Sequence, residues 1–300
     1  MIFTLTVLIR KLVRDLVIIV VVCSLAITFY VYYTNIHPTT VIDDRNPSHT
    51  TLEYENVSFT STDNVALKGW FIPAKNKVPE KPSPTVIVLH GLGLSKSQSL
   101  DWSYFLANDY NLFLFDFRAH GASSGKNTTF GNKETKDVLG AIEYLKRRPD
   151  VDITRVAVYG FSMGASAGIM AAAITADIRV IIADSPYAHL SREVENLYSR
   201  YWIFQKPLAW LTGLWARFLI QTNPADVAPA ESIKLTTAPV LLMAGEDDPA
   251  GVADGAREIY ANAISEGAEL WIVPGTHDTL FMSYRQEFKD RIAAFLKKHL

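Results

Sequence analysis

Residues 155–164 read RVAVYGFSMG, and this stretch decides the fold of the chain. Its first five residues are typical of a buried β-strand, and an alanine-rich helical pattern follows the motif Gly160-Phe161-Ser162-Met163-Gly164. A turn this sharp between strand and helix needs glycine, or a residue nearly as small, two positions before and two after the serine. The sequence therefore predicts that Ser162 occupies a strained turn, where the helix N-terminus stabilises developing negative charge.

A second, overlapping copy of the same spacing occupies Gly164–Gly168, with Ser166 at its centre. Ser166 falls one turn inside the predicted helix, where no such turn can form. We interpret its small neighbours as a sign of close packing between helix and sheet. Ser162 is therefore the predicted nucleophile.

Short runs of β-branched and other apolar residues recur on both sides of this stretch, and helical patterns separate them. Because these runs lack polar alternation, they are typical of strands buried on both faces of a parallel sheet. Residues 53–73 alternate around the turn Thr62-Asp63-Asn64 and predict a β-hairpin. The predicted fold class is α/β, a doubly wound and mostly parallel sheet with the hairpin as its antiparallel edge. The runs are 85–89, 111–115, 156–159, 180–183, 240–244 and 270–273, and the helical patterns are 135–148, 162–174, 253–265 and 284–300.

Two of these runs are followed by candidates for a catalytic acid and base. The motif Gly245–Pro249 reads GEDDP and follows the run 240–244. Asp248 is the predicted acid, Asp247 is a near alternative, and Asp184 is a more remote one. His277 lies in the loop after the run 270–273 and is the predicted base. The order serine, aspartate, histidine along the chain is the one that accompanies a nucleophile turn of this kind.

The loop His90-Gly91-Leu92-Gly93 directly follows the run 85–89. Glycine lets backbone N–H groups point at a substrate oxygen without a Cβ atom in the way. We predict that the backbone N–H groups of Leu92 and Met163 form an oxyanion hole. His90 is interpreted as a structural residue of the loop.

Together these motifs resemble the α/β-hydrolase superfamily over residues 53–300. The segments 55–74, 90–93, 116–125 and 245–249 look like those of S33-like serine hydrolases related to dipeptidyl aminopeptidases and acylaminoacyl peptidases, in a membrane-anchored branch. The resemblance implies a reaction through an acyl-enzyme. It also implies that Arg118 pairs with a carboxylate rather than taking part in catalysis.

The N-terminal region carries an unbroken apolar run, Leu16 to Tyr33, that is long enough to cross a hydrocarbon core as a helix. Arg10, Lys11 and Arg14 precede it, and the positive-inside rule places the N-terminus in the cytoplasm and the catalytic domain outside. No small-x-small cleavage site follows the run, so a single-pass signal anchor is favoured over a cleaved signal peptide.

The predicted organisation is a membrane anchor over 1–36, with the transmembrane part at about 16–33, a linker over 37–52 and a hydrolase domain over 53–300. A cap insertion is expected at about 188–237, because this stretch is too long for a plain connection. The cap is rich in tryptophan, tyrosine and phenylalanine. These aromatic residues either pack the cap onto the body, or line an acyl pocket, or touch the bilayer.

Composition excludes several classes of protein. Of 300 residues 49% are hydrophobic and 20% charged, with a net charge of −2, which argues against a disordered chain and against a nucleic-acid partner. The single cysteine, Cys23, lies in the apolar run, so no intramolecular disulfide is possible. No metal or cofactor is expected. The expected function is a serine hydrolase, esterase or lipase-like, that cleaves a carboxylic ester or related acyl bond in a small-molecule or lipid-like substrate. The alternatives are an aminopeptidase-like serine peptidase and a non-catalytic, membrane-anchored binding module.

Overall fold

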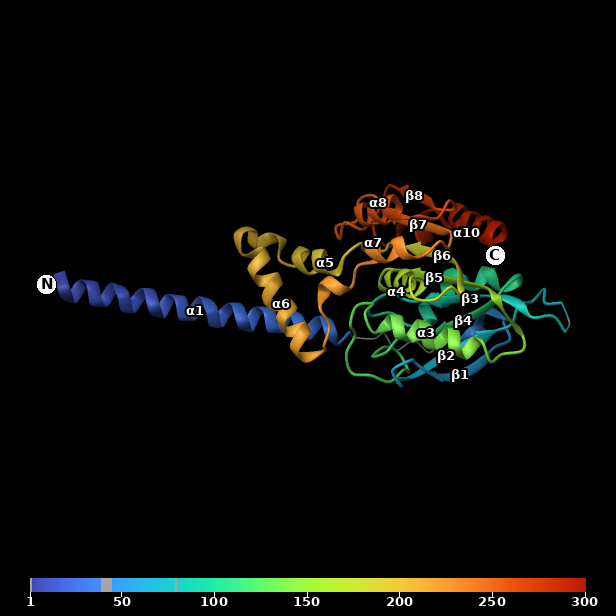
Figure 1. The fold of residues 1–300 in the computed structure, drawn as a ribbon, viewed down its shortest axis with the longest axis horizontal. Helices are drawn as coiled ribbons and strands as arrows, with labels where there is room; N and C mark the ends of the chain where they lie inside the picture. Colours follow the sequence, from blue (N-terminus) through green and yellow to red (C-terminus); the bar gives the residue numbers. More distant parts are fainter. Residues whose placement is uncertain (1, 39–44, 79) are drawn as a thin grey trace.

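The computed structural model describes residues 2–38, 45–78 and 80–300, and its centre is one eight-stranded sheet (Figure 1). The strands lie in the order β1-β2-β4-β3-β5-β6-β7-β8. β1 and β2 form an antiparallel hairpin, β2 is antiparallel to β4, and all other neighbours are parallel. The predicted fold class is thereby confirmed. The strands are β1 (Glu55–Thr60), β2 (Ala66–Ile72), β3 (Ser83–Leu89), β4 (Asn111–Phe115), β5 (Val151–Phe161), β6 (Ile178–Asp184), β7 (Val240–Gly245) and β8 (Glu269–Val273).

Helices cover both faces of the sheet, because successive side chains of each buried strand point to opposite sides. Val158 of β5 belongs to the core cluster under α3, α4 and α8, whereas the next residue, Tyr159, belongs to the cluster under α2 and α10. The helices are α1 (Ile2–Ile36), α2 (Lys96–Ser103), α3 (Glu134–Leu145), α4 (Met163–Ala172), α5 (Leu190–Asn196), α6 (Gln205–Leu219), α7 (Pro229–Ser232), α8 (Val252–Asn262), α9 (Thr279–Ser283) and α10 (Arg285–His299).

The chain between β6 and β7 forms the cap. α5, a 3₁₀ turn at Ser199–Phe204 and α6 project from the body on the side from which α1 extends (Figure 1). The following short helix α7 returns to the body and contacts α4 and α8. Trp202, Trp210 and Phe218 are largely exposed, so these three aromatic side chains do not pack the cap onto the body.

α1 is a single helix of 35 residues that begins well before the apolar run at Leu16. Its segment Thr6–Ile36 is long and apolar enough to cross a membrane, as membrane anchors and signal sequences are. In the linker predicted over 37–52, residues 39–44 lie outside the described residues. The stretch Pro47–Thr50 is a 3₁₀ turn, which begins where the Asn46 side chain accepts a hydrogen bond from the backbone N–H of Ser48.

Candidate active site

Ser162 joins β5 to α4 in a backbone conformation that L-residues rarely adopt, with φ 52° and ψ −116°. Glycine is required on both sides of Ser162 because neighbouring backbone atoms lie where a Cβ atom would be. A Cβ at Gly160 would lie 2.4 Å from the backbone nitrogen of Ala165, and one at Gly164 would lie 2.5 Å from the carbonyl oxygen of Leu89. The Ser162 N–H donates to the carbonyl of Asp184 at 2.8 Å, which fixes the turn against β6. The strained turn predicted from the sequence is therefore present.

The second serine of the overlapping motif is placed differently. Ser166 is fully buried within α4, and its hydroxyl lies 3.4 Å from the carbonyl of Tyr187. A Cβ at Gly168 would contact Leu89 and Val158 side chains, so this glycine lies where helix and sheet pack closely. Ser166 has no access to a substrate.

His277 and Asp248 form a hydrogen-bonded pair at the carboxyl ends of β8 and β7. Nδ1 of His277 lies 2.5 Å from Oδ2 of Asp248, whose side chain is only 2% exposed. The other carboxylate oxygen of Asp248 accepts from the N–H of Ala250 at 2.8 Å. Because a carboxylate accepts only, the Nδ1 of His277 carries the proton, and its Nε2 is the nitrogen free to take another.

The two alternative acids hold other parts of the structure. The carboxylate of Asp247 accepts from the N–H of Gly275 at 2.9 Å, which ties the loop of Asp247 to the loop before His277. Asp184 is buried and accepts from the Ser185 hydroxyl at 3.0 Å, and burial raises its pKa to about 7. Among the described residues, Asp248 is the carboxylate hydrogen-bonded to the His277 ring.

Phe161, the residue before Ser162, packs against the His277 ring. The two rings meet edge to face with centroids 5.0 Å apart, and the Trp102 ring centroid lies 5.6 Å from that of Phe161. The structure contains no hydrogen bond between the hydroxyl of Ser162 and the His277 ring. In unliganded enzymes such bonds are often long and tighten only when substrate binds.

Two backbone N–H groups beside Ser162 are unoccupied. Within the described part of the chain, neither the N–H of Leu92 nor that of Met163 has a hydrogen-bond acceptor. The N–H of Gly93 is already taken by Nε2 of His120, at 3.1 Å. Leu92 and Met163 are the residues predicted as oxyanion donors, and both line the cavity at Ser162.

His90 is held as a neutral structural residue, as its sequence context suggested. Its Nε2 accepts from the N–H of Phe117 at 2.9 Å, so its Nδ1 carries the proton and donates to the carbonyl of Gly91 at 2.7 Å. Complete burial lowers the pKa of His90 to about 3. The ring therefore links the loop of Leu92 to the end of β4 without titrating.

Arg118 pairs with carboxylates, as the family resemblance implied. Its guanidinium lies 2.6 Å from Asp137 and 2.7 Å from Asp63, and its side chain is only 5% exposed. This buried pairing joins the loop after β4 to α3 and to the turn of the β1–β2 hairpin. Arg118 does not line the cavity at Ser162.

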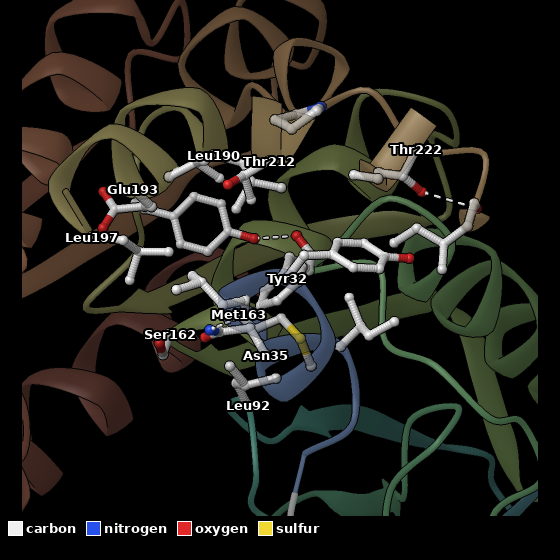
Figure 2. Close-up of a pocket in the computed structure, with 18 residues that line it drawn as sticks. Tyr32, Asn35, Leu92, Ser162, Met163, Leu190, Glu193, Leu197, Thr212 and Thr222 are labelled. Atoms are coloured by element: carbon white, nitrogen blue, oxygen red, sulfur yellow. Dashed lines mark hydrogen bonds between the residues drawn. The ribbon is translucent and has the colours of Figure 1, made fainter. Parts of the chain in front are cut away.

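The cavity at Ser162 has a volume of about 230 Å³ and is lined mainly by apolar side chains. Figure 2 shows Ser162, Met163 and Leu92 along one side and Leu190, Thr212 and Thr222 along the opposite side. Part of the lining comes from α5 and α6 of the cap, and another part from the C-terminal end of α1. No pattern in the sequence predicted that α1 takes part in this site.

Glu193 on α5 is a second lining residue that the sequence analysis missed. In the part of the chain that the structure describes, its carboxylate has neither a hydrogen bond nor an ion pair. Burial first, and the charge of Asp248 second, raise the pKa of Glu193 to about 7, while the neighbouring Arg192 opposes the rise. Across residues 2–38, 45–78 and 80–300, no group of three or more histidine, cysteine, aspartate or glutamate side chains could hold a metal ion.

The nucleophile turn at the centre of a mostly parallel sheet, with a histidine–aspartate pair at the same edge, is the arrangement of the α/β-hydrolase fold. Residues 86–291 match the alpha/beta hydrolase family. The chain belongs to this family, and it is a hydrolase by family and by structural likeness.

Known relatives place the chain among hydrolases and among proteins without an assigned activity. The esterase Pf2001 of Pyrococcus furiosus shares 28% identity, with a TM-score of 0.72 over 89% of this chain and 98% of that one. The uncharacterized protein YfhR of Salmonella typhimurium is 28% identical over 97% of both chains. A thiohydrolase of Eupenicillium brefeldianum is 29% identical over 48% of this chain and 46% of its own.

Proposed function

We propose that the chain is a serine hydrolase that cleaves a carboxylic ester through a covalent acyl-enzyme. The observation that carries the proposal is the set of groups at one edge of the sheet: strained Ser162, the His277–Asp248 pair, and the free N–H groups of Leu92 and Met163. The likeness to an esterase over most of both chains adds support.

In this mechanism Ser162 Oγ attacks the ester carbonyl while His277 Nε2 takes the hydroxyl proton. Asp248 holds the ring in the required tautomer and stabilises the imidazolium that forms. His277 then gives the proton to the departing alcohol as the bond between the carbonyl carbon and the alkoxy oxygen breaks. Water, deprotonated by the same histidine, then attacks the acyl-enzyme. The bond between the acyl carbon and Ser162 Oγ breaks, Oγ takes the proton back from His277, and the acid is released.

The oxyanion of each tetrahedral intermediate accepts hydrogen bonds from the backbone N–H groups of Leu92 and Met163. Because these N–H groups have no other acceptor among the described residues, they need no rearrangement before the charge develops. Loss of one such donor costs roughly 3–4 kcal/mol of transition-state stabilisation in other hydrolases.

The chain offers a matched pair of serines for the test. A fluorophosphonate probe, which reacts only with an activated serine, is expected to label the full chain and its Ser166→Ala variant but not Ser162→Ala. Hydrolysis of p-nitrophenyl acetate should follow the same pattern. Equal labelling of Ser162→Ala and the parent chain would reject Ser162 as the nucleophile. A folded parent chain that is neither labelled nor active would favour the non-catalytic module.

We also propose that α1 anchors the protein in a membrane with its N-terminus in the cytoplasm and the hydrolase domain on the other side. The charge pattern at Arg10, Lys11 and Arg14 supports this orientation. Protease added outside sealed, inside-out vesicles should leave residues 50–300 intact. Digestion of the domain in those vesicles would reverse the orientation.

A further inference from the structure

The cavity at Ser162 is closed on one side by the apolar N-terminal helix. Tyr32 and Ile36 of α1 line the cavity and are only 3% and 4% exposed. By contrast, the apolar side chains from Val7 to Val22 are 46–61% exposed. One continuous helix therefore has a segment suited to hydrocarbon and a segment that forms a wall of the candidate active site.

α6 of the cap supplies the facing wall and holds α1 in place. The Trp215 indole N–H donates to the Thr28 hydroxyl at 3.1 Å, and the Phe29 ring meets the Trp215 ring edge to face, with centroids 5.4 Å apart. Below this contact, apolar side chains of the two helices form one buried cluster. Its buried members are Tyr32, Ile36, Ala216 and Ile220.

Most lining side chains from α1, α5 and α6 are apolar, and the polar ones are Asn35, Glu193 and Thr212. A mainly apolar lining suits a hydrocarbon chain better than a peptide or sugar. The hydroxyl of Tyr32 is buried there and has no hydrogen-bond partner within the described residues. Buried polar groups are nearly always satisfied, so this hydroxyl points to a ligand with one polar group beside an apolar chain.

The outer surface of the cap continues the apolar surface of α1. The turn between α5 and α6 projects from the body on the same side as α1 (Figure 1). Trp202 lies at this turn, and its side chain is 83% exposed. Its backbone has φ 41°, a strained conformation for a residue other than glycine. Tryptophan favours the boundary between lipid and water. The other large exposed side chains of this surface include Ile203, Phe204, Trp210 and Phe218.

The charge of this surface matches a phospholipid layer. Residues 196–225 contain no aspartate or glutamate, and their three cations are Arg200, Lys206 and Arg217. All three are exposed, and in the described structure none forms an ion pair. Exposed aromatic residues together with basic residues are typical of segments that lie in the membrane interface and attract anionic lipids.

We propose that the cavity binds the acyl chain of a membrane lipid ester, which lies along the wall formed by α1 and α6 and presents its carbonyl to Ser162. This substrate class rests on the proposed function. The ester bond between the acyl group and the lipid alcohol breaks, and the alcohol takes its proton from His277. Water then releases the fatty acid. α1 is therefore a wall of the acyl pocket as well as an anchor.

The pocket wall is tested with full-length protein in phosphatidylcholine vesicles and p-nitrophenyl esters from acetate to palmitate. Val31→Trp adds bulk inside the cavity and should lower the ratio of palmitate to acetate kcat/KM at least tenfold. Ile36→Ala widens the cavity and should raise this ratio severalfold. Val22→Trp, at a position of α1 that is 58% exposed, is the control and should leave the ratio unchanged. Fluorophosphonate labelling of each variant reports folding and an active serine.

The outcomes separate the two proposals. An unlabelled, inactive parent chain would defeat the serine hydrolase itself. A labelled, active protein whose chain-length ratio is unaffected by both Val31→Trp and Ile36→Ala would overturn the pocket wall alone.

Entry from the bilayer is tested at the cap surface. The double variant Trp202→Ser with Phe204→Ser should hydrolyse the palmitate ester in vesicles at least tenfold more slowly than the parent, relative to acetate in solution. Adding phosphatidylglycerol should increase the rate at which the parent hydrolyses the palmitate ester in vesicles, because the three exposed cations attract this anionic lipid. Leu235→Ser is the matched control, because Leu235 is 73% exposed and lies just before β7 rather than at the turn between α5 and α6. Equal vesicle rates for the parent and the double variant would refute entry at this surface.

Discussion

The edge of the sheet and the α1–α6 wall are two halves of one site, and they are built by different forces. At the sheet edge, directional hydrogen bonds fix each acidic side chain: Asp248 holds His277, and Asp247 holds the N–H of Gly275. Between α1 and α6, the described residues form one side-chain hydrogen bond, from Trp215 to Thr28, and their buried cluster is apolar. In the proposed hydrolase, the positions of the sheet-edge groups would determine the chemistry, and the volume enclosed by the wall would determine which acyl chain is accepted.

This difference has a consequence for mutagenesis. Hydrogen bonds weaken steeply when their angle or length changes, whereas apolar burial is non-directional and scales with area. Substitutions at the sheet edge should therefore act on kcat, and substitutions along the wall should act on the preference among acyl chains.

The largest effect is expected for Asp248→Asn. The amide would favour the wrong tautomer of His277, and a loss of about 10⁴-fold in kcat follows from the corresponding change in other triads. Asp247→Asn is the matched control. It alters a loop contact and should change kcat less than tenfold. Steady-state kinetics on p-nitrophenyl acetate measures both, and equal losses would show that the Asp248 pairing is not the one used in catalysis.

The second largest effect concerns stability of the body. Arg118→Met would leave Asp137 buried without its partner, and loss of one member of a buried pair costs about 3–5 kcal/mol of unfolding free energy. In the native chain, burial raises the pKa of Asp137 to about 7 while Arg118 opposes that rise. Without Arg118 the folded protein gains a proton more readily than the unfolded chain. The loss should therefore be larger at about pH 8 than at about pH 5.

Denaturant unfolding of the full chain measures this loss. Arg257→Met is the control, because Arg257 pairs with Glu246 and Asp254 at the surface, and it should cost less than about 1 kcal/mol. A pH-independent loss for Arg118→Met would show that Asp137 stays ionised throughout.

The two halves also differ in how far the sequence predicts them. Ser162, Asp248 and His277 each follow their own strand, so local patterns and chain order were enough to select them. The role of α1 in the cavity could not be inferred this way, because Thr28 and Trp215 are 187 residues apart and no periodicity links them. Glu193 was missed because nothing local distinguishes a cavity-facing glutamate from an exposed one.

One short helix was also not predicted from the sequence. The sequence analysis gave no helix at Lys96–Ser103, yet α2 begins there with a capping box between Ser95 and Gln98. The spacing Ser-x-x-Gln is a helix-start signal that the sequence contains. α2 was missed because the helix itself has weak amphipathic patterning and only eight residues.

A smaller effect is expected for Trp215→Phe, which removes the indole N–H but keeps an aromatic ring against Phe29. A neutral hydrogen bond contributes about 1 kcal/mol, so KM for long-chain esters should rise about fivefold with kcat for acetate little changed. Thr28→Val removes the acceptor, and the double variant should be no worse than either single variant. If the effects of the two single variants on KM simply add in the double variant, the hydrogen bond does not couple α1 to the cap.

The smallest effect is expected for Glu193→Gln, and it depends on pH. In the unfolded chain this carboxyl ionises near its ordinary pKa of 4.5, whereas burial and the charge of Asp248 raise its pKa to about 7 in the folded protein. The folded state therefore holds a proton that the unfolded chain has released, and stability from this group is lost as the pH rises from about 5 to about 8. Glutamine cannot ionise, so the variant should match the parent near pH 5 and exceed it by about 1 kcal/mol near pH 8, allowing for the partial exposure of Glu193.

Thermal unfolding across this pH range measures the Glu193 effect, and Glu195→Gln, two residues along α5, serves as the control. A constant offset between Glu193→Gln and the parent at every pH would mean that Glu193 does not titrate in the wall. A stability difference that grows with pH would mean that the Glu193 side chain is a neutral carboxylic acid below about pH 7 and a carboxylate above it. An apolar acyl chain would then be accepted more readily on the acidic side. Glu193 would in that case be a group of the cavity wall that titrates. Its pKa depends partly on the charge of Asp248 at the sheet edge.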